Sequence, residues 1–339
     1  MELGVTTFAE VYAVGDAPPP TYGQRLRDVV EEAVTAERAG LQVYGVGEHH
    51  RADFAASSPA VVLGTIAGRT RRIALTSAVT VLSSDDPVRV YEDFATLDLL
   101  SRGRAEVMVG RGSFTESFPL FGYDLADYDD LFAEKLDLLL RLRADDPVDW
   151  QGRFRSPLRN QMVYPRTERE LPVWIAVGGT PESVIRAGLL GLPLALAIIG
   201  GEPARFAPLV QLYHRALEEG GHPPRPVAVH AHGYIAATER QAVDDFYPAY
   251  AVAMTKIGRE RGWGPMNPGQ FDAMRGPTGS LLVGTPEQVA EKIDAMRDVL
   301  GIERFMLHIS VGTIEHHKVL DAIDLLGSEV AGLLGRRHP

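Results

Sequence analysis

The stretch PVWIAVGGTPESVIRAGLLGLPLALAIIGG, residues 172–201, decides the fold class because it contains two strand patterns separated by a helix pattern. WIAV and LALAII are continuous apolar runs, which suit strands that are buried on both faces of a parallel sheet. Between them, TPESVIRAGLLG has apolar residues at helical spacing and proline at the first helical position. The stretch therefore predicts a strand, a crossover helix and a second, parallel strand.

The same alternation recurs along the chain. Strands are predicted at residues 3–8, 42–47, 72–82, 105–110, 172–179, 193–199, 226–237 and 304–312. Helices are predicted at residues 22–40, 59–69, 87–103, 127–144, 180–191, 203–219, 239–261, 285–301 and 315–334, with Ser58 and Thr285 as caps and Gly40 and Gly103 as stops.

Eight strand–helix units predict a (β/α)8 TIM barrel of the α/β class, formed by residues 1–339 as a single domain. A minimal barrel needs about 250 residues, so the surplus is assigned to loop insertions near residues 145–170 and 262–280. The alternative is an open doubly wound sheet, which would place a glycine-rich phosphate loop after the first strand. The sequence there, TTFAEVYAVGD, is not such a loop.

Composition narrows the class of protein. The formal net charge of −11 disfavours nucleic acids and anionic membranes as partners. The chain has no cysteine, which excludes disulfides, thiolate catalysis and cysteine-ligated metals. The N-terminal sequence lacks a basic start and a long apolar core, so we do not expect a signal peptide, and no apolar run is long enough to span a membrane. We therefore expect a cytoplasmic protein that acts on a small molecule.

In such barrels the active site lies at the carboxyl ends of the strands. The residues that follow the predicted strands are rich in glycine and hydroxyl groups and poor in carboxylates. This composition suits a flat ligand with a phosphate better than hydrolysis by paired acids. In VGGTPESV, Gly178 and Gly179 allow close approach of the backbone, and Thr180 and Ser183 add hydroxyls at a helix N-terminus. The alternative is an ordinary strand-to-helix turn capped by Thr180.

A second pattern is MVGRGSFTESFPLFGYDL, residues 108–125. Arg111 stands between two glycines at a strand end, where its fork can meet a phosphate or a carbonyl oxygen. An ion pair at the barrel rim is the alternative interpretation. The rings of Phe114, Phe118 and Phe121 can wall a substrate pocket or pack within the loop.

The histidines are candidate metal ligands. His49 and His50 are adjacent, so on an extended backbone they point to opposite sides and do not easily bind one metal ion. His230 and His232 share a face, but a zinc site needs a third ligand. Glu48 is a candidate for that ligand, and a metal hydrolase therefore stays as an alternative.

Four segments carry a resemblance to a known family, and together they extend over most of the chain. They are GEHHRADF (47–54), TSAVTVLSSDDPVRVYEDFATLDLLSRGRAEVMVGRGSFTESFPLFGYDL (76–125), VYPRTERELPVWIAVGGTPESVIRAGLLGLPLALAIIGG (163–201) and GTPEQVAEKI (284–293). With them the chain resembles the bacterial-luciferase-like, flavin-dependent monooxygenases, and most closely their non-luminous bacterial subgroup. The resemblance implies a barrel that binds FMN at its mouth.

The resemblance also implies roles for individual residues. The FMN phosphate would lie at Thr180 and Ser183, next to Arg111. Ala78-Val79 matches the site of a non-proline cis peptide beneath the flavin ring, and His49 matches a histidine near the reactive face of that ring. The predicted cofactor-binding residues are Thr7, Ala78, Val79, Arg111, Gly178, Gly179, Thr180 and Ser183, the predicted catalytic residue is His49, and no metal ligand is predicted.

Two departures from the family bear on activity. Light-emitting members carry a reactive cysteine where this chain has Gly110, and an arginine where it has Asp129. These differences argue against luciferase activity on a long aldehyde. The resemblance instead implies oxygenation of a small organic substrate by reduced FMN and O2, with NAD(P)H or a separate flavin reductase as the source of electrons, in a homodimer. The alternatives are a deazaflavin-dependent hydride transferase on the same barrel and a non-catalytic flavin-binding protein.

Overall fold

A closed parallel barrel forms the centre of the molecule. The computed structural model describes residues 1–13, 18–112, 114–144 and 146–337. Neighbouring barrel strands pair in the order β1–β2–β3–β5–β8–β9–β10–β12, and β12 returns to β1. The strands are β1 (Glu2–Thr7), β2 (Val43–Val46), β3 (Ala74–Ser77), β5 (Ala105–Gly110), β8 (Val173–Val177), β9 (Leu194–Ala197), β10 (Val227–Ile235) and β12 (Arg304–His308). All eight predicted strands are therefore present, and the predicted barrel is confirmed.

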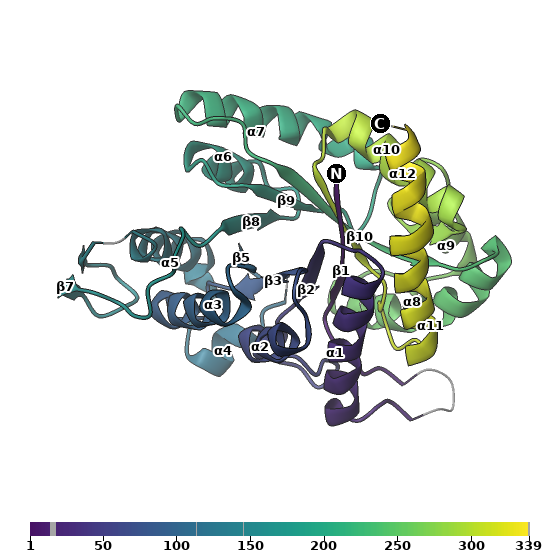
Figure 1. The fold of residues 1–339 in the computed structure, drawn as a ribbon, viewed down its shortest axis with the longest axis horizontal. Helices are drawn as coiled ribbons and strands as arrows, with labels where there is room; N and C mark the ends of the chain where they lie inside the picture. The colour runs from purple at the N-terminus through teal and green to yellow at the C-terminus, as the bar shows by residue number, and fades with distance from the viewer. Residues whose placement is uncertain (14–17, 113, 145, 338–339) are drawn as a thin grey trace.

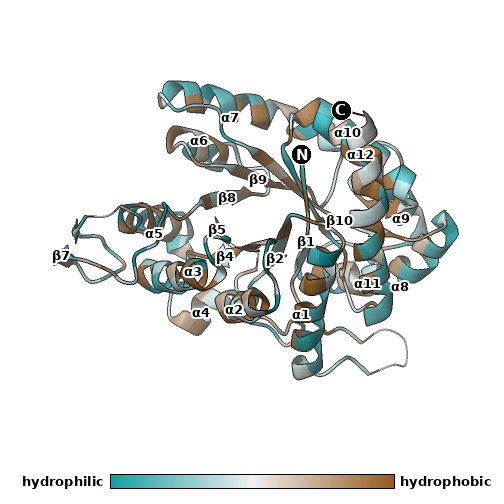
Figure 2. Cartoon of the chain, viewed as in Figure 1, coloured by the Kyte–Doolittle hydropathy of each residue, from teal (hydrophilic) through white to brown (hydrophobic). Residues whose placement is uncertain are grey.

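Helices surround the barrel (Figure 1). Those that follow barrel strands are α1 (Tyr22–Arg38), α2 (Pro59–Arg69), α3 (Pro87–Ser101), α5 (Tyr128–Leu142), α6 (Pro181–Leu189), α7 (Ala207–Glu219), α8 (Glu239–Glu260) and α11 (His316–Leu325), while α10 (Pro286–Leu300) precedes β12. Apolar residues concentrate on the strands and on the helix faces turned toward them (Figure 2). Their burial against the strands is the main stabilising contribution to such a fold.

The predicted helix ends agree with the structure, with one difference in detail. Thr285 caps α10 through a capping box with Gln288, as predicted. Arg102, the C-cap of α3, has φ +61°, and Gly103 follows it with φ +80°, so two residues in the left-handed conformation end this helix. Ser58 occupies the cap position of α2, but its side chain makes no capping hydrogen bond.

The insertions contain regular elements that the sequence does not predict. Residues 145–170 include an antiparallel hairpin of β6 (Val148–Trp150) and β7 (Leu158–Gln161). The second insertion contains α9 (Pro268–Arg275), and β11 (Leu282–Gly284) pairs with the end of β10. These strands have three or four residues, which is too short for a periodic pattern.

Two predicted elements are divided. The strand predicted over residues 72–82 becomes β3 and β4 (Thr80–Val81), which are separated by a cis peptide at Ala78–Val79. The last predicted helix becomes α11, a π-helical turn (Leu326–Val330) and α12 (Ala331–Arg337). A Cβ atom on Gly327 in that turn would lie 2.3 Å from the Ala39 carbonyl oxygen, so the backbone here packs directly against the end of α1.

Charged side chains close the amino end of the barrel. Arg304 is 4% exposed, and it donates hydrogen bonds to Glu106 Oε2 at 2.6 Å and to Glu2 Oε2 at 2.7 Å. Its guanidinium carbon lies 4.3 Å from the centre of the Trp174 ring. This cluster fills the barrel below Met108 and Met306, and the open space of the barrel is therefore confined to its carboxyl end.

Candidate active site

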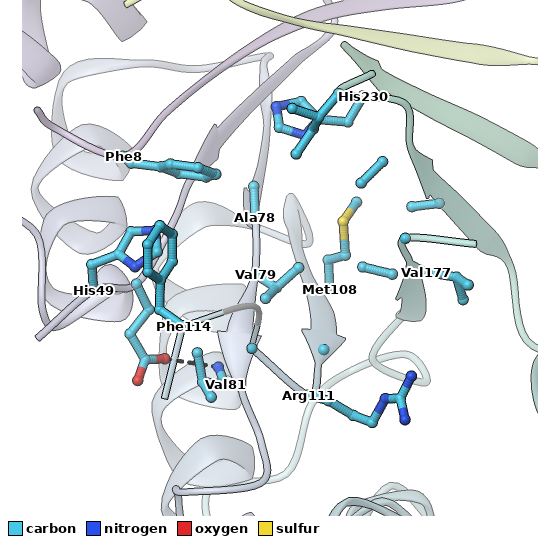
Figure 3. A pocket seen from close by; sticks show the side chains of 18 of the residues that line it. Phe8, His49, Ala78, Val79, Val81, Met108, Arg111, Phe114, Val177 and His230 are labelled. Carbon is cyan, nitrogen blue, oxygen red and sulfur yellow. Dashed lines mark hydrogen bonds between the residues drawn. The ribbon is translucent and has the colours of Figure 1, made fainter. Parts of the chain in front are cut away.

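A cavity of about 480 Å³ opens at the carboxyl ends of the barrel strands. Figure 3 shows Arg111 and His230 on opposite sides of it. Ala78, Val79 and Met108 lie between these two residues (Figure 3). A ligand in the cavity would therefore meet polar side chains on two opposite sides and apolar side chains between them.

The Arg111 end is arranged around α6. Arg111 follows β5 directly, and its Nη2 donates a hydrogen bond to Thr180 Oγ1 at 3.1 Å. Its other terminal nitrogen pairs with the carboxylate of Asp129, which is largely exposed. The ion pair considered for Arg111 is thus present, and the same guanidinium also reaches the start of α6.

The N-terminus of α6 keeps donors available at this end. Thr180 is the cap residue, as predicted, but its hydroxyl accepts from Arg111 and makes no capping hydrogen bond. A Cβ atom on Gly178 would meet nothing within 4 Å, so the turn is open to the cavity. Gly179 has φ +124°, a conformation that glycine adopts without strain. A helix N-terminus beside an arginine favours an anion.

Ala78 and Val79 line the middle of the cavity with small apolar side chains. The peptide between Ala78 and Val79 is cis, as the resemblance implies. A Cβ atom on Gly110 would lie 2.9 Å from Val79 Cγ2. Val79 therefore occupies the space that a larger residue at position 110 would need, which gives a structural reason for glycine where light-emitting relatives carry cysteine.

His49 lies in an aromatic wall beside this surface. Its ring stacks on Phe54 with centroids 4.2 Å apart and meets the edges of Phe8 and Phe114 at 4.9 Å each. Nδ1 lies 3.5 Å from Glu116 Oε1, and the residue is 8% exposed. A histidine held by rings on several sides, with a carboxylate at one nitrogen, can present its other nitrogen to a ligand in a fixed orientation.

Glu48 and His50 fix the loop that carries His49. Glu48 Oε2 accepts from the Val81 backbone N–H at 2.9 Å, and Oε1 accepts from His50 Nε2 at 2.8 Å. The hydrogen bond to Glu48 raises the pKa of His50 despite its partial burial. Glu48 and His50 also border a second cavity of about 560 Å³ near α2 and α3, where burial raises the pKa of Asp85 to about 6.

The structure brings most, though not all, of the predicted site residues to the cavity. His49, Ala78, Val79, Arg111, Gly178 and Thr180 line it. Gly179 and Ser183 lie just behind this surface in the α6 turn, and Ser183 is 5% exposed. Thr7 points away from the cavity, and its hydroxyl lies 2.9 Å from Ser310 Oγ. Of the three phenylalanines considered, only Phe114 lines this cavity, whereas Phe118 stacks on Tyr128 and Phe121 borders the second cavity.

Three histidines at the far end, of which His232 and His308 are buried and His230 is half-buried, are a feature that sequence reasoning did not assign to the site. His230 and His232 do share the inner face of β10, and His308 on β12 lies between them, with ring centroids 5.4 Å from each. Among the described residues, no group of three or more histidine or acidic side chains is placed to hold a metal ion. Burial, together with the smaller effect of His308, lowers the pKa of His230 to about 3.

This pKa predicts an acid sensitivity of folding. The unfolded chain binds a proton at His230 near pH 6.5, whereas the folded chain does so only near pH 3. The free energy of unfolding must therefore decrease as the pH falls below about 6.5, by up to about 1.4 kcal/mol per pH unit for this group. In His230→Gln this slope is expected to be smaller. Urea unfolding at several pH values measures it, with His317→Gln as an exposed control, and an unchanged slope in His230→Gln would contradict the prediction.

Comparison with known proteins gives the family. Luciferase-like monooxygenases match residues 1–303 of the chain. The uncharacterized protein y4wF of Sinorhizobium fredii is 32% identical over 57% of this chain, and the chain spans 56% of that protein. The 4-hydroxyprotoasukamycin monooxygenase of Streptomyces nodosus subsp. asukaensis is 29% identical, with 86% and 80% covered. An F420-dependent glucose-6-phosphate dehydrogenase of Amycolatopsis mediterranei is 33% identical over 45% of the chain, and the match covers 48% of the dehydrogenase.

Solved structures share the fold at lower identity. The monooxygenase RslO1 from Streptomyces bottropensis has a TM-score of 0.85 at 22% identity, with 98% of this chain and 99% of that chain covered. The oxygenating constituent of 3,6-diketocamphane monooxygenase from Pseudomonas putida, in complex with FMN, has a TM-score of 0.78 at 17% identity. An F420-dependent secondary alcohol dehydrogenase has a TM-score of 0.78 at 18% identity. The alignments with these last two structures each cover 98% of both chains. With its barrel, its site at the strand ends and a family match that spans most of its length, the chain belongs to the luciferase-like monooxygenases.

Proposed function

We propose that this protein binds FMN at the mouth of the barrel and uses reduced FMN and O2 to insert one oxygen atom into a small organic substrate. The observation that carries the proposal is the pairing of Arg111 with Thr180 at the start of α6, at one side of the cavity. This arrangement suits a phosphate, and the adjoining wall of Ala78 and Val79 suits a flat ring. Among the structural neighbours, a monooxygenase is in complex with FMN.

The residues present fit the coenzyme at both of its parts. Gly178 leaves open space where a side chain would stand, just before the N-terminus of α6, whose free N–H groups would favour a phosphate. Arg111 and Thr180 would hold the phosphate, with Ser183 and Gly179 in the turn behind them. When bound, reduced FMN supplies the electrons that activate O2, a reaction that protein side chains do not perform alone.

The chain's own side chains would control the surroundings of that reaction. Phe8, Phe54 and Phe114 form an aromatic wall around His49 and would exclude water from the ring face of the coenzyme. His49 is proposed to donate a hydrogen bond or a proton there, with Glu116 orienting its ring through Nδ1.

A deazaflavin is the second candidate coenzyme, because relatives that use F420 share both sequence and fold with this chain. The experiment is to titrate the purified protein with FMN and with F420 and to follow the visible spectrum. Tighter binding of FMN, and O2 consumption after its reduction by NAD(P)H, are expected. Tighter binding of F420 without O2 consumption would replace the monooxygenase proposal with hydride transfer, and binding of neither would refute both.

The charge of Asp129 is expected to weaken the binding of FMN. Its carboxylate pairs with Arg111 and places a negative charge near the proposed phosphate position. Asp129→Asn removes that charge, so FMN is expected to bind roughly 3- to 10-fold more tightly at low salt. Fluorescence titration measures the change. Asp130→Asn, an equally exposed neighbour that faces Arg153, is the control, and equal effects of the two variants would contradict the assignment.

The quaternary structure and the source of electrons are also proposed. We expect a homodimer through α2 and α3, where Val61 and Leu100 are 71% and 69% exposed. A separate flavin reductase would supply reduced FMN if the protein does not accept electrons from NAD(P)H itself. Within the ranges described above, no helix is long and apolar enough to cross a membrane. Sedimentation analysis of Val61→Glu tests the dimer, and an unchanged mass would reject this interface.

A further inference from the structure

A chain of hydrogen-bonding side chains leads from the cavity into the barrel wall. His230 borders the cavity, and its Nε2 lies 2.7 Å from Thr6 Oγ1. The same hydroxyl lies 3.3 Å from His308 Nδ1, which also lies 3.3 Å from His230 Nε2, so the hydroxyl is the closer of two groups that link His308 to His230 Nε2. His308 Nε2 lies 2.7 Å from Glu10 Oε1. Thr6, His308 and Glu10 are 4%, 0% and 3% exposed, so this chain is screened from bulk water.

Further groups surround the inner end of this chain. Glu10 Oε2 accepts from Ser310 Oγ at 3.2 Å, and Arg25 Nη2 donates to Ser310 Oγ at 3.2 Å and to Thr7 Oγ1 at 2.9 Å. Arg25 also forms a buried ion pair with Glu32.

Beyond that ion pair the series of polar side chains continues from Glu32 on α1 to His316 on α11. Glu32 accepts from Tyr44 OH at 3.0 Å and lies 3.7 Å from His316 Nδ1. His316 faces the carboxylates of Glu31 and Asp28 as well.

The buried charges of this cluster are the carboxylates of Glu10 and Glu32 and the guanidinium of Arg25, with the His316 ring on the outer side of Glu32. Arg25 and His316 both face Glu32, whereas Glu10 has the His308 ring at hydrogen-bond distance. A carboxylate and an imidazole in direct contact, both screened from water, form a pair that can hold one proton between them. Arg25 does not give up its own proton, so it closes the inner end of the chain.

His230 has the properties of a group that passes a proton without keeping it. Burial, and then His308, keep its pKa far below that of an ordinary histidine, so its ring stays neutral. A neutral imidazole that accepts a proton at one nitrogen and releases one from the other moves charge without storing it. His232, whose pKa is also lowered by burial, lies 6.3 Å away between ring centroids and has no partner at Nδ1.

We propose that Glu10 and His308 store one proton and deliver it through the Thr6 hydroxyl to His230, which releases it into the cavity. Each link shifts one proton: His308 Nδ1 gives its proton to Thr6, Thr6 gives its own to His230 Nε2, and His230 releases the proton from Nδ1. His308 is left neutral and is protonated again from the cavity between turnovers.

This inference rests on the proposed function, which needs such a proton. Anionic reduced FMN, O2, substrate and one proton give oxidised FMN, oxygenated substrate and water. Without substrate, the same reactants and one proton give oxidised FMN and hydrogen peroxide. His49 is enclosed by apolar rings, so a proton store at the His230 end supplies a second source for that proton.

The test compares Thr6→Val, Thr6→Ser and Glu10→Gln with the wild type in two measurements. The first is the oxidation of bound, chemically reduced FMN by O2, followed in H2O and D2O across pH. Glu10→Gln is expected to slow it roughly 10- to 100-fold and to change its pH profile, because it removes the store. Thr6→Val is expected to slow it roughly 5- to 10-fold, because only the direct 3.3 Å contact between His308 Nδ1 and His230 Nε2 then remains. Thr6→Ser keeps a hydroxyl and is expected to stay within about threefold of the wild type.

The second measurement needs no coenzyme. Nitrogen-15 NMR of the histidine rings in the free protein reports which nitrogen carries the proton. Thr6→Val is expected to change the tautomer signals of both His230 and His308, whereas Thr76→Val, a buried threonine on β3 that bonds only Ser77 O, is expected to change neither. Unchanged ring signals in Thr6→Val would overturn the hydrogen-bond chain.

The outcomes separate the two proposals. If the wild type binds no FMN or does not oxidise it with O2, the proposed function fails, and the NMR comparison still decides whether the chain exists. If FMN reacts normally and Thr6→Val matches the wild type in rate, pH profile and isotope effect, the relay is rejected while the proposed function stands.

Discussion

Arg111→Ala is expected to weaken FMN binding about 100-fold, because a charged hydrogen bond to a phosphate contributes roughly 1.5–3 kcal/mol and its loss also exposes a repulsion. The repulsion comes from Asp129, whose carboxylate is neutralised by Arg111 in the folded chain. With the guanidinium gone, this carboxylate would face the phosphate directly. Titration of coenzyme fluorescence at fixed ionic strength measures the change.

A double substitution separates the two contributions. Arg111→Ala combined with Asp129→Asn should recover part of the lost affinity, since the repulsive charge is then absent, and the cycle measures the coupling between the two side chains. Arg111→Lys should lie between the wild type and alanine, because an ammonium keeps the charge but loses the planar fork.

The control is another arginine of the same region. Arg186 on α6 lies over the Phe132 ring and outside the cavity, so Arg186→Ala should leave the affinity for FMN within about twofold of the wild type. If Arg111→Ala bound FMN as tightly as Arg186→Ala, the phosphate would have to lie elsewhere, and the proposed orientation of the coenzyme would be abandoned.

The barrel was predictable because the strands are marked by composition as well as by period. Runs such as WIAV and LALAII are apolar on both faces, and a helix pattern follows nearly every one of them. What the sequence did not reveal depends on contacts between distant segments. The π turn near Gly327 exists where this glycine packs on the end of α1, and β11 exists because the end of β10 offers it an edge.

The site was predictable only where it is local in sequence. Arg111, Thr180 and His49 each follow a strand, and the barrel brings such positions together. The relay residues Thr6 and His308 stand on inner faces of strands 302 positions apart, and nothing in either segment indicates the contact. The shared face of His230 and His232 was visible, and one signal was overlooked: the same alternation puts His308 on the inner face of the last strand.

A large loss of stability is expected from Gly4→Ala on β1, where Gly4 pairs with Val43 of β2. A Cβ atom on Gly4 would lie 2.4 Å from the Val43 carbonyl oxygen and 2.7 Å from Met306 Sδ. The first contact is to backbone that is itself paired within the sheet, so it cannot move aside without breaking the register of Gly4 with Val43. A decrease of about 3 kcal/mol in the free energy of unfolding is therefore expected.

Gly64→Ala in α2 is the matched control, because a Cβ atom there would meet nothing within 4 Å. In a helix interior the same substitution should raise the free energy of unfolding by about 0.5–1 kcal/mol, since alanine restricts the unfolded chain more than glycine does. Urea titration of both variants should give changes of opposite sign in the free energy of unfolding if the close approach of the backbone at β1 is what requires glycine. If Gly4→Ala had the same midpoint of urea unfolding as the wild type, β1 and β2 could move apart without loss of stability. The position of Thr6, the next inward-facing residue of β1, would then not be fixed by this contact.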